Sequence, residues 1–421
     1  MWIRIRAMSP TRIARLGIRT AMALAAVATA FAQSQANAPT RAALYAGVGE
    51  ELIAFGTDVE RATLTRQTSV MLPGFVQEAW APSRTPFLYV AWSNGGSSYN
   101  GSGVEPRGDR HGITAFRIDA DGALHQQGAP AALRSRPIHI TGDGPERHLL
   151  VAYNDPSGVS VHAINADGSV GGEVPQRASI DPGVYAHQVR VLPSNRAVVV
   201  VTRGNEPTAS SREDPGALKV FRYDAGALSN EISIAPHNGV GYRARHLDFH
   251  PTRPWVFLSL ESQNQLQVYR RSDEGLEATP LFTVSTLADG GKNTQGQTTS
   301  TVHVHPSGRF VYVGNRGTPT TGRCNEIAVF RINEATGEPT LVQNADTHGF
   351  TPRTFSLDPS GRLLVVGNQS SVSVRDGTST TEVPANLAVF RIGSDGTLTF
   401  VQRHDVAVGR KPLWWMGIVA R

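Results

Sequence analysis

The sequence predicts an all-β fold, a seven-bladed β-propeller whose C-terminal strand closes the first blade. Three observations predict it. A hairpin unit recurs, most clearly as STVHVHPSGRFVYVGNRG (300–317) and RTFSLDPSGRLLVVGNQ (353–369). An apolar strand ending in small or polar residues occurs seven times, at a mean spacing near 53 residues. The chain also ends in an unmatched apolar strand, LWWMGIVA (413–420). Internal repeats of this length are typical of propellers.

Each repeat supplies four strands, which we expect to form one blade. The first strand precedes a tight turn such as HPSG or DPSG, and its copies lie at 75–82, 137–143, 187–193, 245–251, 301–306 and 353–359. The second strand follows that turn, at 44–49, 88–93, 149–154, 198–203, 256–261, 311–316 and 364–369. The third is rich in branched and aromatic residues, at 52–58, 113–119, 159–165, 218–224, 266–272, 327–333 and 387–393. A weaker fourth strand ends each blade, as at 398–406.

Only six first strands precede a second strand, because the chain enters its first blade directly at LYAGVG (44–49). The strand at 413–420 supplies the seventh copy. Pairing it into the first blade would close the ring and remove two exposed sheet edges. We therefore expect 28 strands in a single domain over residues 40–421. No stretch of this domain shows the sustained helical periodicity that would predict a helix instead.

The first 32 residues read as a signal peptide. Five arginines without any acidic residue precede the apolar stretch at 21–32, and small residues follow. Cleavage after Ala32 is our first choice and cleavage after Ala36 remains open, so the segment could extend to about residue 38. Without residues 1–38 the chain has 35 basic and 35 acidic residues, which argues against nucleic-acid binding. We expect a periplasmic or secreted monomer that is free of the membrane after cleavage.

The composition offers no sign of a cofactor or metal site. The single cysteine, Cys324, cannot form an intrachain disulfide, and it lies in a polar loop where we interpret it as structural. His303 and His305 alternate along one strand, but no acid or cysteine completes a ligand set nearby. We interpret the turn histidine as a partner of backbone groups. We expect no metal and no cofactor.

The long connections follow the second strands, at 93–112, 204–217, 317–326 and 369–386, or precede the first strands, at 235–244 and 285–300. Both kinds leave an antiparallel blade at the same edge, so all should lie at one mouth of the ring. Loops carry function more often than scaffold does, which makes this mouth the candidate site.

Aligning blades 4 to 7 on the tight turn reveals charge at two positions near that mouth. The start of the first strand carries His187, Arg245, Ser300 and Arg353, and the end of the second carries Arg203, Glu261, Arg316 and Gln369. A carboxylate among arginines and a histidine can activate water and hold an anion. The alternative is structural: a Glu–Arg pair that ties blades 5 and 6 together.

The repeats resemble the lactonase family of seven-bladed propellers, most strongly from residue 185 to 400. The resemblance is carried by the stretches RHLDFHP…SLE, HPSGRFVYVGNRG and TPRTFSLDPSGRLLVVGNQ…NLAVFRI. That family includes propeller-type 6-phosphogluconolactonases and carboxy-cis,cis-muconate cyclases. The resemblance implies four active-site groups, His187, Arg245, Glu261 and Arg316. Arg353 would support them, and Arg203 and Gln369 complete the substrate-binding set. Where the family often has Pro-Asp-Leu-Gly, this chain has Val201-Thr202-Arg203-Gly204. The aspartate is lost and Arg203 is gained, which leaves the substrate open.

The resemblance implies an exported hydrolase that opens a cyclic ester, with an acidic or sugar lactone as its small-molecule substrate. Glu261 would act as general base toward water, and His187 would assist proton transfer. Arg245 and Arg316 would bind an acidic substituent or the developing oxyanion. Two alternatives remain open: a cycloisomerase or lyase acting on a muconate-like acid, and a propeller that binds a partner in the periplasm without catalysis.

Overall fold

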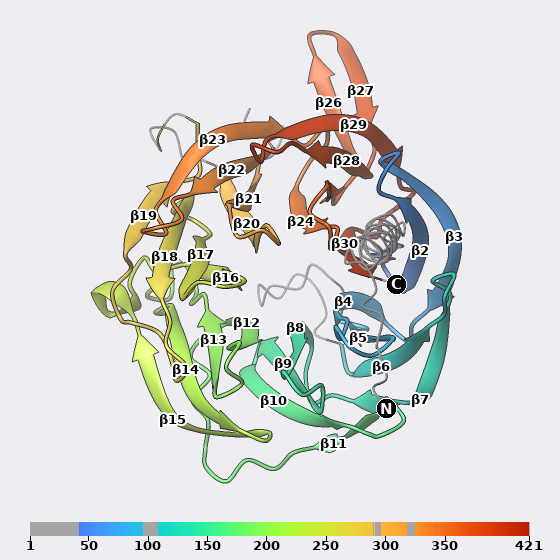
Figure 1. The fold of residues 1–421 in the computed structure, drawn as a ribbon. Helices are drawn as coiled ribbons and strands as arrows, with labels where there is room; N and C mark the ends of the chain where they lie inside the picture. The colour runs from blue at the N-terminus through green and yellow to red at the C-terminus, as the bar shows by residue number, and fades with distance from the viewer. Residues whose placement is uncertain (1–41, 96–107, 289, 291–295, 318–324, 421) are drawn as a thin grey trace, which may run out of the picture. The chain divides into compact units, whose positions relative to one another are not determined.

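The computed structural model describes residues 42–95, 108–288, 290, 296–317 and 325–420. The predicted signal segment and Cys324 lie outside these ranges. The described chain forms seven four-stranded antiparallel sheets arranged as blades around a central axis (Figure 1). The predicted seven-bladed propeller is thereby confirmed. Among the described residues no helix is long and apolar enough to cross a membrane.

The blades are built alike, with consecutive strands running outward from the axis. In blade order, the innermost strands are β30 (Leu413–Ala420), β4 (Phe75–Trp80), β8 (Pro137–Gly142), β12 (Ala186–Val191), β16 (Ala244–Phe249), β20 (Thr298–Val304) and β24 (Pro352–Leu357). The second strands are β1 (Ala42–Val48), β5 (Phe87–Ser93), β9 (His148–Asn154), β13 (Ala197–Thr202), β17 (Trp255–Leu260), β21 (Phe310–Arg316) and β25 (Leu363–Asn368).

The two outer positions complete each blade. The third strands are β2 (Glu51–Asp58), β6 (His111–Ile118), β10 (Ser157–Ile164), β14 (Ala217–Asp224), β18 (Gln265–Arg270), β22 (Glu326–Ile332) and β28 (Asn386–Ile392). The outermost strands are β3 (Thr63–Met71), β7 (Leu124–Ala132), β11 (Val170–Glu173), β15 (Ala227–Ile234), β19 (Phe282–Ser285), β23 (Pro339–Asp346) and β29 (Leu398–Asp405). A short 3₁₀ turn, η1 (Pro236–Gly239), follows β15.

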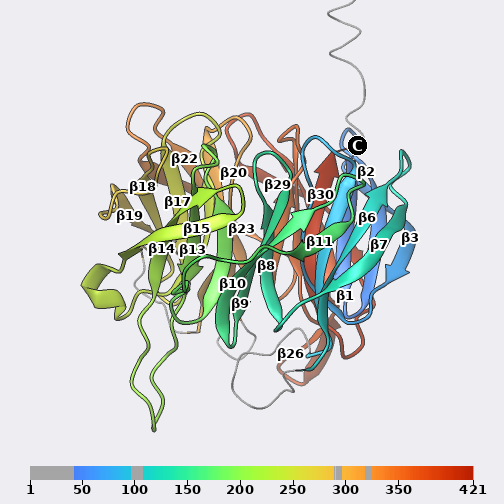
Figure 2. The same ribbon diagram turned by 90° about the horizontal axis from the view of Figure 1, so that it is seen from below.

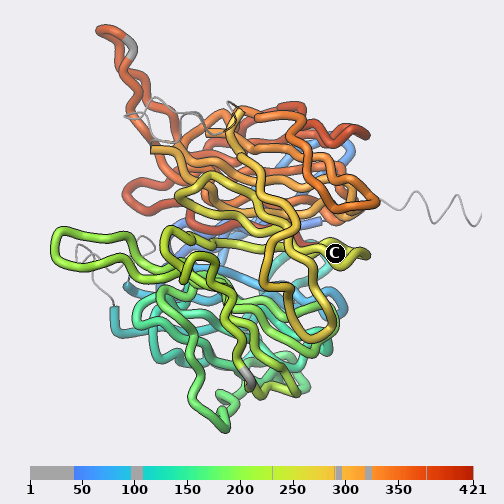
Figure 3. Tube along the Cα trace, turned by 90° about the vertical axis from the view of Figure 1, so that its left-hand side faces the viewer, coloured from blue at the N-terminus to red at the C-terminus, as the bar shows by residue number. Residues whose placement is uncertain are grey.

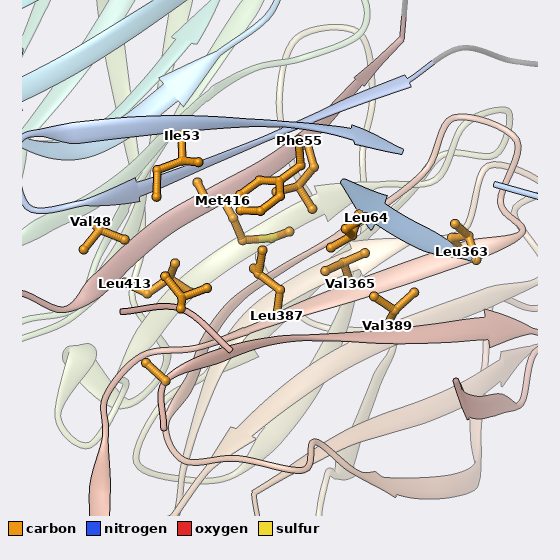
Figure 4. Close-up of a cluster of buried hydrophobic side chains, with 14 of the residues drawn as sticks. Val48, Ile53, Phe55, Leu64, Leu363, Val365, Leu387, Val389, Leu413 and Met416 are labelled. Atoms are coloured by element: carbon orange, nitrogen blue, oxygen red, sulfur yellow. The ribbon is translucent and has the colours of Figure 1, made fainter. Parts of the chain in front are cut away.

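The ring closes as predicted, because β30 pairs antiparallel with β1 in the first blade. Ala42 lies opposite Ala420, and the register runs to Gly47 opposite Trp415. Blade 1 therefore combines the two ends of the propeller, and its packing against blade 7 shows the result. Phe55 and Leu64 of blade 1 meet Val365 and Leu387 of blade 7 in one buried cluster (Figure 4).

Apolar side chains fill the space between every pair of adjacent blades. Seven separate clusters of buried residues occupy the seven junctions, and the second and third strands supply most of them. These strands are covered on both faces, which explains their continuous apolar sequence. The two tryptophans of β30 face different ways: Trp415 packs between blades 1 and 2, and Trp414 lines the cavity near the axis.

Tight turns are tied to the neighbouring blade by repeated hydrogen bonds. The hydroxyl groups of Tyr45, Tyr89 and Tyr312 each donate to a glycine carbonyl of the next blade, at 3.0 Å. The imidazoles of His250 and His305 likewise contact the carbonyls of Gly308 and Gly361, at 2.9 and 2.8 Å. The turn histidines therefore satisfy backbone groups, as we interpreted them.

Two long connections project from the same face of the ring (Figures 2 and 3). One joins β13 to β14. The other, between β25 and β28, folds into a hairpin of β26 (Val372–Asp376) and β27 (Ser379–Val383). We predicted only a loop there. Apolar and polar residues alternate only before the turn, from Val372 to Arg375. The hairpin closes through the two-residue loop Gly377-Thr378 between the paired residues Asp376 and Ser379, and Gly377 adopts the positive φ that such a turn favours at its first position.

Candidate active site

A cavity of about 810 Å³ opens at the mouth that the long connections surround. It lies within the size range of ordinary small-molecule sites. Six of the seven predicted site residues line it: His187, Arg203, Arg245, Glu261, Arg316 and Arg353. Gln369 is not among the lining residues. Its backbone instead joins the segment before β24 to β30: its amide donates to the carbonyls of Phe350 and Thr351, and its carbonyl accepts a hydrogen bond from the Leu413 amide at 2.9 Å.

A β-bulge in every innermost strand explains how these side chains reach the axis. At the same height in each blade, the pairing with the second strand skips a residue; in β12, Ala186 and Gln188 pair with consecutive residues and His187 is left out. The residues skipped are Gln77, Ile138, His187, Arg245, Ser300 with Thr301, Arg353 and Trp414. Bulges re-aim side chains and recur beside active sites. Here five of the skipped residues line the cavity.

The other charged groups come from the ends of second strands. Arg316 is the last residue of β21, and Arg203 and Glu261 directly follow β13 and β17. The Glu261 amide donates to the Arg243 carbonyl at 2.7 Å, and its carbonyl accepts from the Thr299 amide at 3.0 Å. Glu261 is thus fixed by the backbone of its own blade and of the next.

Three arginines surround the Glu261 carboxylate. Arg203 Nε donates to Oε2 at 2.5 Å, Arg316 Nη2 donates to Oε1, and Arg245 Nε lies 3.8 Å from Oε1. Burial opposes ionisation, but the charges of Arg316, Arg245 and Arg203 outweigh it and hold the pKa of Glu261 well below its usual range. The carboxylate is therefore ionised at neutral pH, and it links blades 4, 5 and 6.

His187 is a neutral imidazole whose tautomer follows from its partner. Arg245 Nη1 lies 2.7 Å from His187 Nε2, and a guanidinium can only donate. Nε2 is therefore the acceptor and the ring proton resides on Nδ1, which has no hydrogen-bond partner among the described residues. Burial, followed by the charge of Arg245, lowers the pKa of His187 well below its usual range. In this arrangement His187 orients the Arg245 guanidinium.

Arg136, which sequence reasoning missed, joins Arg353 on a second side of the cavity. The Arg353 guanidinium lies 3.5 Å above the Trp414 ring, and Arg136 lies 5.9 Å from the same ring. Arg136 is 2% exposed and donates to Asn154 Oδ1 at 3.3 Å. No carboxylate among the described residues forms an ion pair with Arg353. Arg136 immediately precedes an innermost strand, a repeat position that our alignment did not compare.

Repulsion among these arginines makes the cavity attractive to anions. Burial and the charges of Arg245, Arg316 and Arg136 lower the pKa of Arg353 well below its usual range. Burial and Arg316 lower the pKa of Arg245 to about 9, so its guanidinium stays protonated at neutral pH. An anionic ligand beside Arg353 would relieve the unbalanced charge. Within the described part of the chain, no set of three or more His, Cys, Asp or Glu residues is placed to hold a metal ion.

The opposite half of the channel holds a second cavity of about 340 Å³, lined by the later residues of all seven innermost strands. Arg190 and Asp248 form an ion pair there at 3.0 Å, between blades 4 and 5. Glu78 lies in the same wall and accepts a hydrogen bond from the Ala79 amide at 3.3 Å. Burial raises the pKa of Glu78 to about 8, so this carboxyl is largely protonated at neutral pH.

Comparison with known proteins identifies one family. The profile described as "Lactonase, 7-bladed beta-propeller" matches residues 47–376. A 6-phosphogluconolactonase of Serratia proteamaculans is 28% identical over 349 residues, which cover 82% of this chain and 89% of that protein. One from Bacillus subtilis is 28% identical over 277 residues, covering 64% and 73%.

Solved structures share the architecture. A putative 6-phosphogluconolactonase from Bacteroides fragilis superposes with a TM-score of 0.66 at 18% identity, covering 90% of this chain and 98% of that one. A structure described as the periplasmic gluconolactonase of Pseudomonas aeruginosa gives a TM-score of 0.65 at 21% identity, covering 90% and 99%. At these identities the structural likeness establishes the fold.

Proposed function

Because the chain belongs to the lactonase family of seven-bladed β-propellers, we propose that it hydrolyses a lactone in the cavity around Glu261. One observation carries the proposal: five arginines, one from each of blades 3 to 7, converge with the ionised Glu261 on one cavity. Curated relatives named 6-phosphogluconolactonase support the reaction class. The bridging alternative explains the contacts between Glu261 and its arginines, but it leaves the unpaired Arg353 without a purpose.

The proposed reaction adds water to the ester carbonyl. Glu261 accepts the proton of the attacking water, and Arg245 and Arg316 stabilise the oxyanion of the tetrahedral intermediate. The low pKa of Glu261 makes it a weak base in the free site. As negative charge develops on the substrate oxygen, the arginines interact with that oxygen as well as with Glu261. Because their interaction with Glu261 weakens, the basicity of Glu261 rises. His187 keeps Arg245 in place, which replaces the proton-transfer role suggested by the sequence.

The distribution of charge favours a lactone with an anionic substituent. Glu261 already balances Arg203, Arg245 and Arg316, so their capacity for another anion is limited until the reaction begins. Arg353 lies apart from this cluster, against the Trp414 ring, and no carboxylate among the described residues pairs with it, so it is available for a carboxylate or phosphate. We propose that the substrate places its acidic group there and its ester carbonyl between Arg245 and Arg316.

Acid release from a panel of lactones tests the proposal. The purified protein is assayed with glucono-δ-lactone, its 6-phosphate and an uncharged δ-valerolactone, with spontaneous opening measured in parallel without enzyme. We expect turnover above the spontaneous rate, with the highest kcat/KM for the charged lactone. If no lactone is opened but a muconate-like acid changes its absorbance, the cycloisomerase alternative is favoured instead.

Export is a separate part of the proposal. The arginine-rich start and the apolar stretch at 21–32 support it. Expression of the full chain followed by N-terminal sequencing of the mature protein tests it. We expect the mature protein to begin after Ala32 or Ala36, whereas an intact N-terminus in the cytoplasmic fraction would contradict export.

A further inference from the structure

Arg243 is a buried cation that does not line the cavity itself and yet holds one of its walls. It precedes β16 by one residue and is 2% exposed. Its guanidinium contacts two carboxylates, with Nε 2.9 Å from Glu206 Oε1 and Nη2 2.5 Å from Glu213 Oε1. It also donates to three carbonyls of the same connection, those of Arg203, Asn205 and Asp214, at 3.1 to 3.3 Å.

The connection that Arg243 holds runs from β13 to β14 and forms one wall of the cavity. Its lining residues are Asn205, Glu206, Thr208, Ser211 and Asp214. Most of its other hydrogen bonds are internal, such as Asn205 Nδ2 to Asp214 Oδ2 at 2.9 Å. Ser262 and the Gly241 amide also contact its carboxylates. Among the residues that the structure describes, Arg243 alone reaches the connection from outside at both of its ends.

The same residue fixes the distance between this wall and the reactive carboxylate. The Arg243 carbonyl accepts the hydrogen bond of the Glu261 amide at 2.7 Å, while its side chain holds the connection. Arg203 belongs to both parts, because its carbonyl contacts Arg243 and its side chain contacts Glu261. A lysine cannot replace this function, since a single ammonium lacks the planar array of five donors.

The wall presents hydrogen-bond acceptors to the cavity. The side chain of Glu206 is half-exposed, and carboxylate oxygens can only accept. Asn205 uses its amide nitrogen on Asp214, so its side-chain oxygen remains an acceptor. Acceptors of this kind suit the hydroxyl groups of a polyhydroxylated ligand. They face a cavity whose other side carries Arg136 and Arg353.

We propose that Arg243 is a positioning residue that clamps the connection of residues 203–214 against the candidate active site, so that its acceptors select substrates carrying hydroxyl groups. The selection rests on the proposed lactonase function. The clamp does not, because it follows from the contacts of Arg243 alone.

Limited proteolysis tests the clamp without any assay of activity. Arg212 is exposed on the connection and offers a trypsin site. In Arg243→Met we expect cleavage after Arg212 to accelerate roughly tenfold or more, since several hydrogen bonds to a charged group are lost and the segment opens locally. Arg243→Lys should be intermediate. Arg196→Met, which removes an exposed ion pair with Glu274 between blades 4 and 5, is the matched control and should leave cleavage unchanged.

Glu206→Gln tests the same contact from the side of the loop, in case the Arg243 variants do not fold. It removes one carboxylate and leaves Glu213 to pair with the buried arginine. The substituted residue is not next to the bond that trypsin cuts, and cleavage after Arg212 should again accelerate. Unchanged cleavage in both Arg243→Met and Glu206→Gln, with the thermal midpoints showing folded protein, would overturn the clamp.

Kinetics then test the selection. For glucono-δ-lactone, Arg243→Met should raise KM about tenfold with little change in kcat, the loss expected for roughly one hydrogen-bonding interaction with a charged group. For δ-valerolactone, which lacks hydroxyl groups, KM should stay unchanged. An equal loss for both lactones would overturn the selection. If the wild-type protein opens no lactone, the proposed function fails, and the cleavage result still decides the clamp.

Discussion

Replacing Glu261 by glutamine separates a catalytic carboxylate from a structural bridge. Gln keeps the shape of Glu261 but removes the charge that balances Arg203, Arg245 and Arg316. Breaking a buried ion pair on one side costs roughly 3–5 kcal/mol of unfolding free energy. Loss of a positioned base lowers turnover by about 10²–10⁴-fold. Stability alone therefore does not distinguish the two roles, and a second ion pair is needed for comparison.

Asp248→Asn provides that comparison. Asp248 joins blades 4 and 5 through Arg190 at 3.0 Å, in the other half of the channel. Burial opposes its ionisation, but Arg190 and His303 prevail and lower its pKa to about 2. Against an unfolded value of about 3.9, this shift corresponds to about 2–3 kcal/mol of stability. That stability is fully present above the unfolded pKa and is lost as pH falls toward 2.

The two variants are compared by urea unfolding at pH 7 and by lactone turnover. We expect both to lose stability and only Glu261→Gln to lose turnover. If Glu261→Gln unfolds at lower urea concentration yet keeps most of its turnover, as Asp248→Asn should, then Glu261 is a bridge and the catalytic assignment is wrong.

Three further predictions follow from the described contacts. Arg353→Met should raise KM for a phosphorylated lactone by about 10–100-fold and leave KM for an uncharged lactone nearly unchanged, because the lost interaction involves a charged group; equal effects on both lactones would contradict an anion subsite. Glu78→Gln should stabilise the protein increasingly, relative to the unsubstituted chain, as pH rises from about 4.5 to 8. The reason is that the carboxyl group of the unfolded chain ionises in that range while the buried one stays protonated. Thermal midpoints of both proteins across this range measure the effect, and a difference between them that does not change with pH would argue against a raised pKa of Glu78. Removal of residues 412–421 should open the ring and expose the edge of β1 to aggregation, seen by size-exclusion chromatography as loss of the monodisperse species; a truncated chain that stays monodisperse with unchanged unfolding would show that closure is dispensable.

The architecture could be predicted because every repeat carries the same apolar strands and turn residues. The final strand was assigned to the first blade from a simple count of strands. The six predicted residues that line the cavity all came from aligning two repeat positions, since a charge at a position near the axis stands out against an apolar background. Gln369 was drawn into the set by the same alignment, although its role is in the backbone.

Other features depended on three-dimensional contacts. Arg136 and Arg243 occupy one repeat position, directly before an innermost strand, which an alignment of all blades at that position would have found. The role of His187 could not be predicted, because it depends on which nitrogen faces Arg245. The raised pKa of Glu78 depends on burial by strands from distant parts of the chain.

The bulges in the innermost strands place the residues that line the cavity at positions that the strand pairing does not use. A skipped residue contributes no pairing to the sheet, so its side chain can change while the ladder on either side remains intact. Each blade thus offers one position at the same height around the axis, and in this chain several of these positions hold uncharged residues, among them Gln77, Ile138 and Ser300. In a propeller of this kind, the residues that contact a ligand can therefore be substituted one blade at a time, and ligand specificity can change without loss of the strand pairing.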